Sequence, residues 1–226
     1  MESTLIELIR HFEKYTSEIQ PNSEEDNLTS FAIYLHGQLD LARIESKSFE
    51  KEQWKSFSRD TLIEMAAAYL GKMGRYVDQY ARKNMPSTPI ENLDEFTYLI
   101  LLLQVESITK SEIIQRNVHP ITTGTEILKR LIKKEFITQF PDDLDRRKMR
   151  VSLTEKGRIA LFESAETTRK LALIASGILT NEELIAFVST LKKLDLFHKK
   201  IHLNYKNLDL TAVMTDESIL KLISKK

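Results

Sequence analysis

Apolar side chains recur at helical spacing along most of this chain. Between Thr61 and Lys83 they return every three or four positions, the pattern of a helix with one buried face: Leu62, Met65, Ala66, Tyr69, Leu70, Met73, Tyr76, Val77 and Tyr80. The same spacing predicts an amphipathic helix before Pro21, a helix after Asn92, and long helices after Thr154 and Thr180. Helices therefore dominate the predicted fold.

Capping signals mark where several of these helices begin. Asn92, Thr109 and Thr180 each precede a glutamate by three positions, which is the spacing of a capping box. The helix that opens near Thr109 is predicted to be short, from Ser111 to Arg116. A turn at residues 117–120 then leads into a second helix, from about Thr122 to Glu135.

After this second helix the pattern changes from helical spacing to alternation. Apolar residues lie on both sides of a basic tip: Phe136, Ile137 and Phe140 before it, Val151 and Leu153 after it, and Arg146, Arg147, Lys148 and Arg150 within it. This pattern predicts two strands joined by a charged hairpin. The order of helix, turn, helix, basic β-ribbon and helix is that of a winged helix-turn-helix.

The ribbon and the helix before it resemble the MarR family, the multiple antibiotic resistance type of bacterial transcription regulator. The family pattern is an acidic residue, one position, then arginine, a short strand, and Leu-Thr-x-x-Gly opening a helix; this chain has Asp145-Arg146-Arg147 and Leu153-Thr154-Glu155-Lys156-Gly157. Residues 128–137 are similar to the end of the family's recognition helix, with Glu135 where a glycine is common. The resemblance covers about residues 60 to 205. It implies a mainly α fold, a winged helix-turn-helix with a small β-hairpin wing and long N- and C-terminal dimerisation helices.

The resemblance and the polar breaks divide the chain into three parts. We expect an N-terminal helical extension, a MarR-like domain and a C-terminal tail with a last short helix, at residues 1–58, 59–205 and 206–226. Within the second part we expect the winged helix and two dimerisation helices, at about residues 90–160, 61–84 and 155–204. Inside the extension we expect a polar break at residues 21–27 and a linker or solvent-facing helix at residues 43–58.

Charge is unevenly distributed although the formal net charge is zero. Residues 129–150 hold eight basic side chains against four acidic ones, whereas residues 1–30 hold seven carboxylates against two basic side chains. A local positive face is typical of phosphate binding even on a neutral protein. The side chains predicted to bind DNA are Thr122, Thr123, Thr125, Glu126, Lys129, Arg130, Lys133, Arg146, Arg147, Lys148 and Arg150.

Asp145, Gly124 and one member of this set, Glu126, need separate consideration. Asp145 is expected to structure the wing, because a carboxylate beside Arg146 and Arg147 can hold an arginine through a charge-assisted hydrogen bond. Glu126 stands where the family often has a base- or phosphate-contacting residue, and a carboxylate there repels phosphate unless it accepts from a cytosine amino group. Gly124 either costs the helix about 1 kcal/mol relative to alanine or lets the backbone approach a sugar-phosphate strand, and both interpretations stay open.

The remaining composition excludes several function classes. Zero cysteines exclude disulfides, thiolate metal sites and a thiol-based oxidation switch. His198 and His202 share i, i+4 spacing but lack a third ligand nearby, so we expect no metal and no cofactor. Motifs of catalytic nucleophiles and nucleotide-binding loops are missing, and we expect a protein that is not an enzyme. Neither a membrane span nor a secretory signal is predicted, so we expect a cytoplasmic protein without membrane contact.

Together these patterns predict a sequence-specific double-stranded DNA-binding transcription regulator of MarR type, acting as a homodimer on a pseudo-palindromic operator. The resemblance also implies a repressor that responds to a ligand, a wing tip that enters the minor groove, and a pocket for a small aromatic effector. The pocket residues would be Tyr69, Met73, Tyr76 and Tyr98, for which simple core packing is the alternative. The competing hypothesis is a winged-helix interaction or dimerisation module that does not read DNA. Glu126 and the zero net charge favour it, and the arginine-rich wing opposes it.

Overall fold

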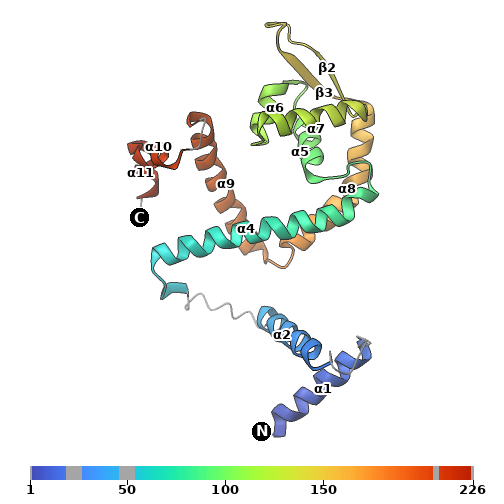
Figure 1. Ribbon diagram of the computed structural model, residues 1–226, viewed down its shortest axis with the longest axis vertical. Helices are drawn as coiled ribbons and strands as arrows, with labels where there is room; N and C mark the ends of the chain where they lie inside the picture. The colour runs from blue at the N-terminus through green and yellow to red at the C-terminus, as the bar shows by residue number, and fades with distance from the viewer. Residues whose placement is uncertain (1, 19–26, 46–53, 206–208, 225–226) are drawn as a thin grey trace. The chain divides into compact units, whose positions relative to one another are not determined.

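The computed structural model describes residues 2–18, 27–45, 54–205 and 209–224 (Figure 1). It divides into two compact units, residues 1–68 and residues 69–226. Parts of the predicted polar break and of the predicted linker, at residues 19–26 and 46–53, lie outside the described residues.

The first unit contains two paired helices, α1 (Glu2–Glu18) and α2 (Asn27–Glu45). They pack through aromatic rings: Phe12 meets Phe31 edge-on with ring centroids 5.0 Å apart, and Tyr15 lies against Phe31 and Tyr34. Tyr15 and Phe31 are buried. Large rings stabilise such a pair because each removes much apolar surface from water.

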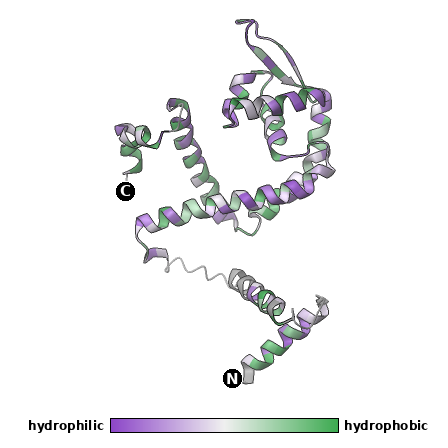
Figure 2. Ribbon diagram, in the orientation of Figure 1, coloured by the Kyte–Doolittle hydropathy of each residue, from purple (hydrophilic) through white to green (hydrophobic). Residues whose placement is uncertain are grey.

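The long helix α4 runs from Arg59 to Asn84, within two residues of the helix that the apolar periodicity predicts at each end. Pro86 follows its end, since proline lacks the backbone N–H that would continue the helix, and the chain turns through the 3-10 segment η1 (Met85–Ser87). Most apolar side chains of α4 are exposed in the single chain, and Ala81 is its buried residue. Figure 2 shows hydrophobic and hydrophilic residues alternating along this helix.

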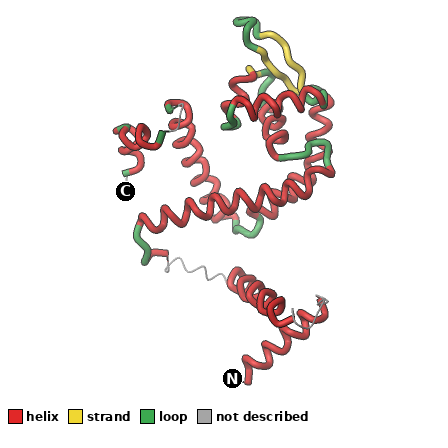
Figure 3. Tube along the Cα trace, in the orientation of Figure 1, coloured by secondary structure: helices red, strands yellow, loops and turns green. Residues whose placement is uncertain are grey.

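The winged helix is built from six short elements: α5 (Leu93–Leu103), β1 (Ile108–Thr109), α6 (Lys110–Arg116), α7 (Ile121–Lys133), β2 (Ile137–Pro141) and β3 (Met149–Leu153), all visible in Figure 3. The strands form an antiparallel sheet in the order β1-β3-β2. Val151 of the central strand faces Ile108 on one side and Gln139 on the other. Strand β1 was not predicted, because two residues are too few to show alternation.

One apolar core joins the helices and the sheet of this domain. Its almost fully buried large side chains are Met85, Ile90, Tyr98, Leu99, Leu102, Ile108, Ile113, Ile127, Leu128, Leu131, Ile137 and Val151. Ala160 and Leu161 of α8 (Glu155–Ser176) extend it. Burying one leucine or isoleucine side chain stabilises a fold by about 1.5 to 3 kcal/mol. The core therefore sets the positions of α7 and of the wing.

Helix α8 and helix α9 (Asn181–Asn204) begin at their predicted caps. Thr154 caps α8, and Thr180 forms a complete capping box at α9. At Asn92 and Thr109 only half of the predicted box forms, because the glutamate three positions later binds basic side chains instead. No residue of α9 is buried in the single chain.

The C-terminal tail contains two short helices, α10 (Leu210–Thr215) and α11 (Glu217–Ile223), where one was predicted. Asp216 separates them, and its carboxylate caps α11 by accepting from the backbone N–H groups of Ser218 and Ile219. Within the described ranges, no single helix is long and apolar enough to cross a membrane, and α8 and α9 meet the length and composition only as a pair bent by 97°.

Candidate DNA-binding surface

The turn between α6 and α7 sets the direction of α7. Val118 takes a left-handed conformation with φ 57°, and the side-chain amide of Asn117 donates to a carbonyl of α6 at 2.9 Å. The Nδ1 atom of His119 lies 3.2 Å from the hydroxyl of buried Tyr98, which ties the turn to α5. Pro120 precedes α7, and no side chain caps the N–H groups of its first turn. Such groups favour a bound anion.

Gly124 is where α7 comes closest to the rest of the domain. A Cβ atom at this position would lie 2.5 Å from Cγ1 of Ile114 and 2.8 Å from the hydroxyl of Tyr98. These distances are far below van der Waals contact. The close approach that Gly124 permits is therefore to the protein core, and the alternative of an approach to a DNA strand is wrong.

Helix α7 ends two residues earlier than predicted, because Glu135 adopts the left-handed conformation with φ 61°. This is the position where the MarR pattern commonly has a glycine, and glycine reaches that conformation without a Cβ penalty. Two contacts hold the strained residue in place. The Glu135 carboxylate accepts from Nζ of Lys156 at 2.6 Å, and its backbone carbonyl accepts from the hydroxyl of Thr154 at 2.7 Å.

The solvent-facing stripe of α7, defined here as Thr122, Glu126, Lys129 and Lys133, lies opposite its buried face. These four residues are spaced by three or four positions and are all exposed. Nζ of Lys129 lies 2.7 Å from Oε1 of Glu126, so the carboxylate that sequence reasoning could not place is paired within the stripe. Thr123 is also exposed, whereas the hydroxyl of Thr125 donates to the carbonyl of Ile121 at 2.7 Å.

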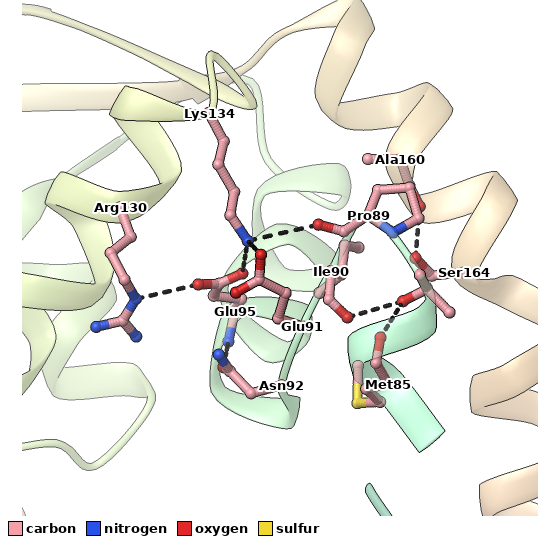
Figure 4. A network of polar contacts seen from close by, with 11 residues as sticks. Met85, Pro89, Ile90, Glu91, Asn92, Glu95, Arg130, Lys134, Ala160 and Ser164 are labelled. Carbon is pink, nitrogen blue, oxygen red and sulfur yellow. Dashed lines mark hydrogen bonds and ion pairs between the residues drawn. The ribbon is translucent and has the colours of Figure 1, made fainter. Parts of the chain in front are cut away.

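Arg130 was predicted to be available for DNA, but a buried glutamate holds part of it. Glu95 of α5 is 0% exposed and accepts from Nε of Arg130 at 3.1 Å and from Nζ of Lys134 at 2.8 Å (Figure 4). Nζ of Lys134 also lies 3.2 Å from Oε1 of Glu91 and donates to the carbonyl of Pro89 at 3.5 Å. Burial alone would raise the pKa of Glu95, but the hydrogen bonds from Lys134 and Arg130 bring it below its usual range. The capping-box pattern had suggested a different partner for Glu95.

The wing tip presents exposed basic side chains on a structured turn. Arg146, Arg147 and Lys148 are all exposed. The carboxylate of Asp145 accepts from the backbone N–H of Arg147 at 3.2 Å and from its Nε at 3.1 Å. The Arg147 side chain nevertheless stays 92% exposed. Asp145 thus makes the kind of contact expected of it, and Arg147 presents its guanidinium in a restrained position.

Arg150 was placed in the DNA-binding set, but its donors are used inside the protein. Nε donates to the hydroxyl of Ser107 at 2.9 Å, Nη2 to the Ser107 carbonyl at 2.8 Å, and Nη1 to Oδ2 of Asp142 at 2.8 Å. The Arg150 hydrogen bond is the main reason that the pKa of Asp142 is low. Arg150 thus fastens the wing to the segment before β1. Sequence reasoning missed both partners, since Ser107 is 43 positions away.

Of the four residues predicted to form an effector pocket, three lie on one face of α4 and the fourth lies in the core. Tyr69, Met73 and Tyr76 lie exposed on α4, whereas Tyr98 is fully buried in the core, where burial first and Asp94 second raise its pKa to about 12. A cavity of about 770 Å³ lies elsewhere, lined by residues of α5, α6 and α9, and none of the four predicted residues lines it. In the part of the chain that the structure describes, no cluster of three His, Asp or Glu side chains could hold a metal ion.

The geometry described above belongs to a known class of domain. Residues 103–157 match the family model described as a winged helix DNA-binding domain. The match includes α6, the turn, α7 and both strands of the wing, so the predicted winged helix-turn-helix is confirmed. A comparison with curated proteins gave no match.

Solved structures of similar fold place the chain more narrowly. A MarR family transcriptional regulator from Streptomyces coelicolor in complex with DNA superposes with a TM-score of 0.55 at 13% identity, covering 62% of this chain and 91% of that one. A mutant MarR from E. coli complexed with operator DNA superposes with a TM-score of 0.52 at 19% identity, covering 61% of this chain and 99% of that one. BpsR of Bordetella bronchiseptica superposes with a TM-score of 0.53 at 20% identity, covering 58% of this chain and 98% of that one. This chain has the MarR-type fold, as predicted.

Proposed function

We propose that this protein is a homodimeric transcription regulator of MarR type that binds double-stranded DNA through α7 and the wing. The observation that supports it best is the winged helix itself, which carries an exposed stripe on α7 and an exposed basic wing tip. Thr122 and Thr123 in the first turn of α7 are the side chains that reach base edges, because N-terminal residues of a recognition helix make the base contacts. Lys129 and Lys133, farther along, contact phosphates.

The wing adds a second contact in this proposal. Arg147 inserts its guanidinium into the minor groove, where Asp145 limits the entropy that the side chain loses on binding. Arg146 and Lys148 lie beside it and neutralise phosphates. Arg150 has no direct contact with DNA, since its guanidinium is occupied by Ser107 and Asp142.

The dimer follows from the apolar surface that one chain leaves exposed. Helix α9 has no buried residue, and several of its large apolar side chains are open to solvent: Ile185, Phe187, Val188, Leu191, Leu196 and Leu203. Tyr69, Leu70 and Met73 of α4 and Ile159, Phe162 and Ile174 of α8 are exposed in the same way. Large apolar side chains left exposed along three helices in this way are typical of an interface. A second copy that covers it would present two recognition helices to half-sites about 34 to 36 Å apart.

We also propose that a small aromatic acid regulates this protein. Binding of the acid releases the protein from the operator, so that the protein represses transcription only when the acid is absent. DNA binding by the similar BpsR is regulated by 6-hydroxynicotinic acid. Tyr69, Met73 and Tyr76 are the candidate contacts on α4, whereas Tyr98 is buried in the core and pairs with His119. Peroxide should not release the complex, because the chain has no cysteine to oxidise.

The Glu126–Lys129 pair favours a second candidate, a winged helix that serves as a protein-interaction module. Selection of binding sites from a pool of random duplexes separates the two. The regulator should enrich one pseudo-palindromic site and bind it as a dimer in sedimentation experiments. Binding of no duplex above background would leave the interaction module as the better proposal.

Arg147→Ala tests the wing within the same assay. We expect it to weaken binding of the selected site by about 1 to 3 kcal/mol, the value of one arginine contact, without changing the far-UV circular dichroism. Arg82→Ala on α4 is the matched control, because Arg82 is exposed and its Nε pairs with Asp78 as that of Arg147 does with Asp145, on the face of α4 opposite Tyr69 and Met73. Equal affinity of the Arg147 variant and the wild type would exclude a wing contact.

A further inference from the structure

The Glu95 carboxylate has no role in the surface proposed above, yet it is fully buried directly behind α7. Taking a carboxylate out of water costs several kcal/mol, and an apolar residue of similar volume would often stabilise a fold as well. Stability alone therefore does not account for this buried ion pair. The two cations around Glu95 differ in a way that indicates another role.

Lys134 is the anchored cation. Its three N–H donors face three acceptors: Oε2 of Glu95 at 2.8 Å, Oε1 of Glu91 at 3.2 Å and the carbonyl of Pro89 at 3.5 Å. Its side chain is 22% exposed. Lys134 thus joins the end of α7 to the segment between η1 and α5, and it has no donor left for DNA.

Arg130 is the cation that stays open to solvent. Only its Nε donates to Glu95, and its side chain is 47% exposed. Figure 4 shows its two Nη atoms pointing away from the carboxylate. Because guanidinium is planar and rigid, one hydrogen bond at Nε restricts the directions in which the four remaining N–H groups point. Arg130 follows Lys129 in α7 and lies on the flank of the solvent-facing stripe.

We propose that Glu95 is a positioning residue for DNA binding: it holds Arg130 so that the Nη groups donate to a phosphate of the DNA backbone. A phosphate is the expected ligand because Arg130 lies in the C-terminal half of α7, whereas base edges are read from the N-terminal turn. This inference rests on the proposed function. It adds a contact that runs from a buried carboxylate through one arginine to the backbone of the duplex.

The test is a double-mutant cycle on the full-length protein, with binding of the selected duplex and of random duplex measured at several salt concentrations. Glu95→Gln should lower affinity for both duplexes about fivefold or more, the lower range for loss of one arginine contact. The slope of log affinity against log salt should fall by up to about one unit. Arg130→Gln should do the same, and Glu95→Gln should add nothing in the Arg130→Gln background.

Two opposing outcomes are built into this cycle. Loss of a carboxylate raises the net charge, so a purely electrostatic role predicts that Glu95→Gln tightens binding. A purely structural role predicts a lower unfolding midpoint with unchanged affinity and salt slope of the folded protein. Either result, or additive losses in the double variant, would overturn the proposal. Asp78→Asn is the matched control, since Asp78 also pairs with an arginine but is exposed on α4, on the face opposite Tyr69 and Met73 by helical spacing, and its binding should equal that of the wild type.

Arg130→Lys keeps the proposal testable if Glu95→Gln does not fold. It retains the charge but not the planar fork, and we expect it to lose as much affinity as Arg130→Gln; wild-type affinity would contradict the positioning role. Arg147→Ala, measured in the same experiments, separates a failure of the proposed role of Glu95 from a failure of the proposed DNA-binding function. If it weakens binding and the Arg130 variants do not, only the role of Glu95 fails. If the wild type binds no duplex, the proposed function fails with it.

Discussion

Replacing Gly124 with alanine should destabilise the winged helix, although alanine is the better helix former. In a helix, alanine is favoured over glycine by about 1 kcal/mol. Here the new Cβ atom would lie 2.5 Å and 2.6 Å from the two γ carbons of Ile114 and 2.8 Å from the hydroxyl of Tyr98. Neither neighbour can yield easily, since Ile114 is buried and the Tyr98 hydroxyl is tied to His119.

The size of the effect follows from these two opposing contributions. Overpacking a filled core costs about 1 to 3 kcal/mol, occasionally more. Contacts as short as 2.5 Å place Gly124→Ala at the upper end of that range, because α6 and α7 must move apart. After the gain in helix propensity is subtracted, we expect a net loss of about 1 to 2 kcal/mol. The displaced α7 should also bind DNA more weakly.

Urea unfolding followed by circular dichroism measures this loss, and Gly74→Ala is the control. Gly74 lies within α4, and a Cβ atom there would meet nothing within 4 Å. Gly74→Ala should therefore stabilise the protein by up to about 1 kcal/mol. The reasoning is refuted if Gly124→Ala stabilises the protein as Gly74→Ala does, because the close contact would then not exist in solution.

Three further predictions concern charge. If Glu126 faces a phosphate, Glu126→Arg should tighten binding to any duplex and steepen the salt dependence of binding. If Glu126 accepts from a cytosine, the same change should weaken binding to the selected site only. Unchanged binding to both the selected and the random duplex would mean that α7 does not contact DNA. Lys148→Ala should lower the slope of log affinity against log salt by about one unit without changing sequence preference. Arg150→Ala should mainly lower the free energy of unfolding, because Arg150 binds Ser107 and Asp142. DNA titrations over a salt series, together with urea unfolding, distinguish the two effects. The pKa of Glu95 is lower in the folded than in the unfolded protein. The contribution of the ionised Glu95 carboxylate to stability should therefore be complete above about pH 4.3 and be lost as the pH falls through the folded-state pKa. The urea midpoint of Glu95→Gln should accordingly decrease less than that of the wild type as the pH is lowered.

Helices, caps and strands were predictable because the interactions that specify them are local. A capping side chain and the N–H group that it binds lie three positions apart, as at Thr154 and Thr180. The apolar residues of α4 recur every three or four positions. The order of these elements, with the motif around Asp145 and Leu153, was enough to predict the winged helix. Glu135 was noted as a position where a glycine is common, but its left-handed conformation was not predicted, since the helix was expected to run to Glu135.

Whether Arg130 and Arg150 remain available to DNA was decided by tertiary structure. In the sequence these two arginines have no partner within reach that the pattern identifies, whereas Arg147 has Asp145 two positions away. In the fold, Arg130 meets Glu95 from 35 positions away, Arg150 meets Ser107 from 43 positions away, and Arg147 meets its own neighbour Asp145. Periodicity shows which face of an element a residue occupies, but not which side chain packs against that face from elsewhere in the chain. Hydrogen bonds of arginine act over about 3 Å, so its role depends on that distant partner.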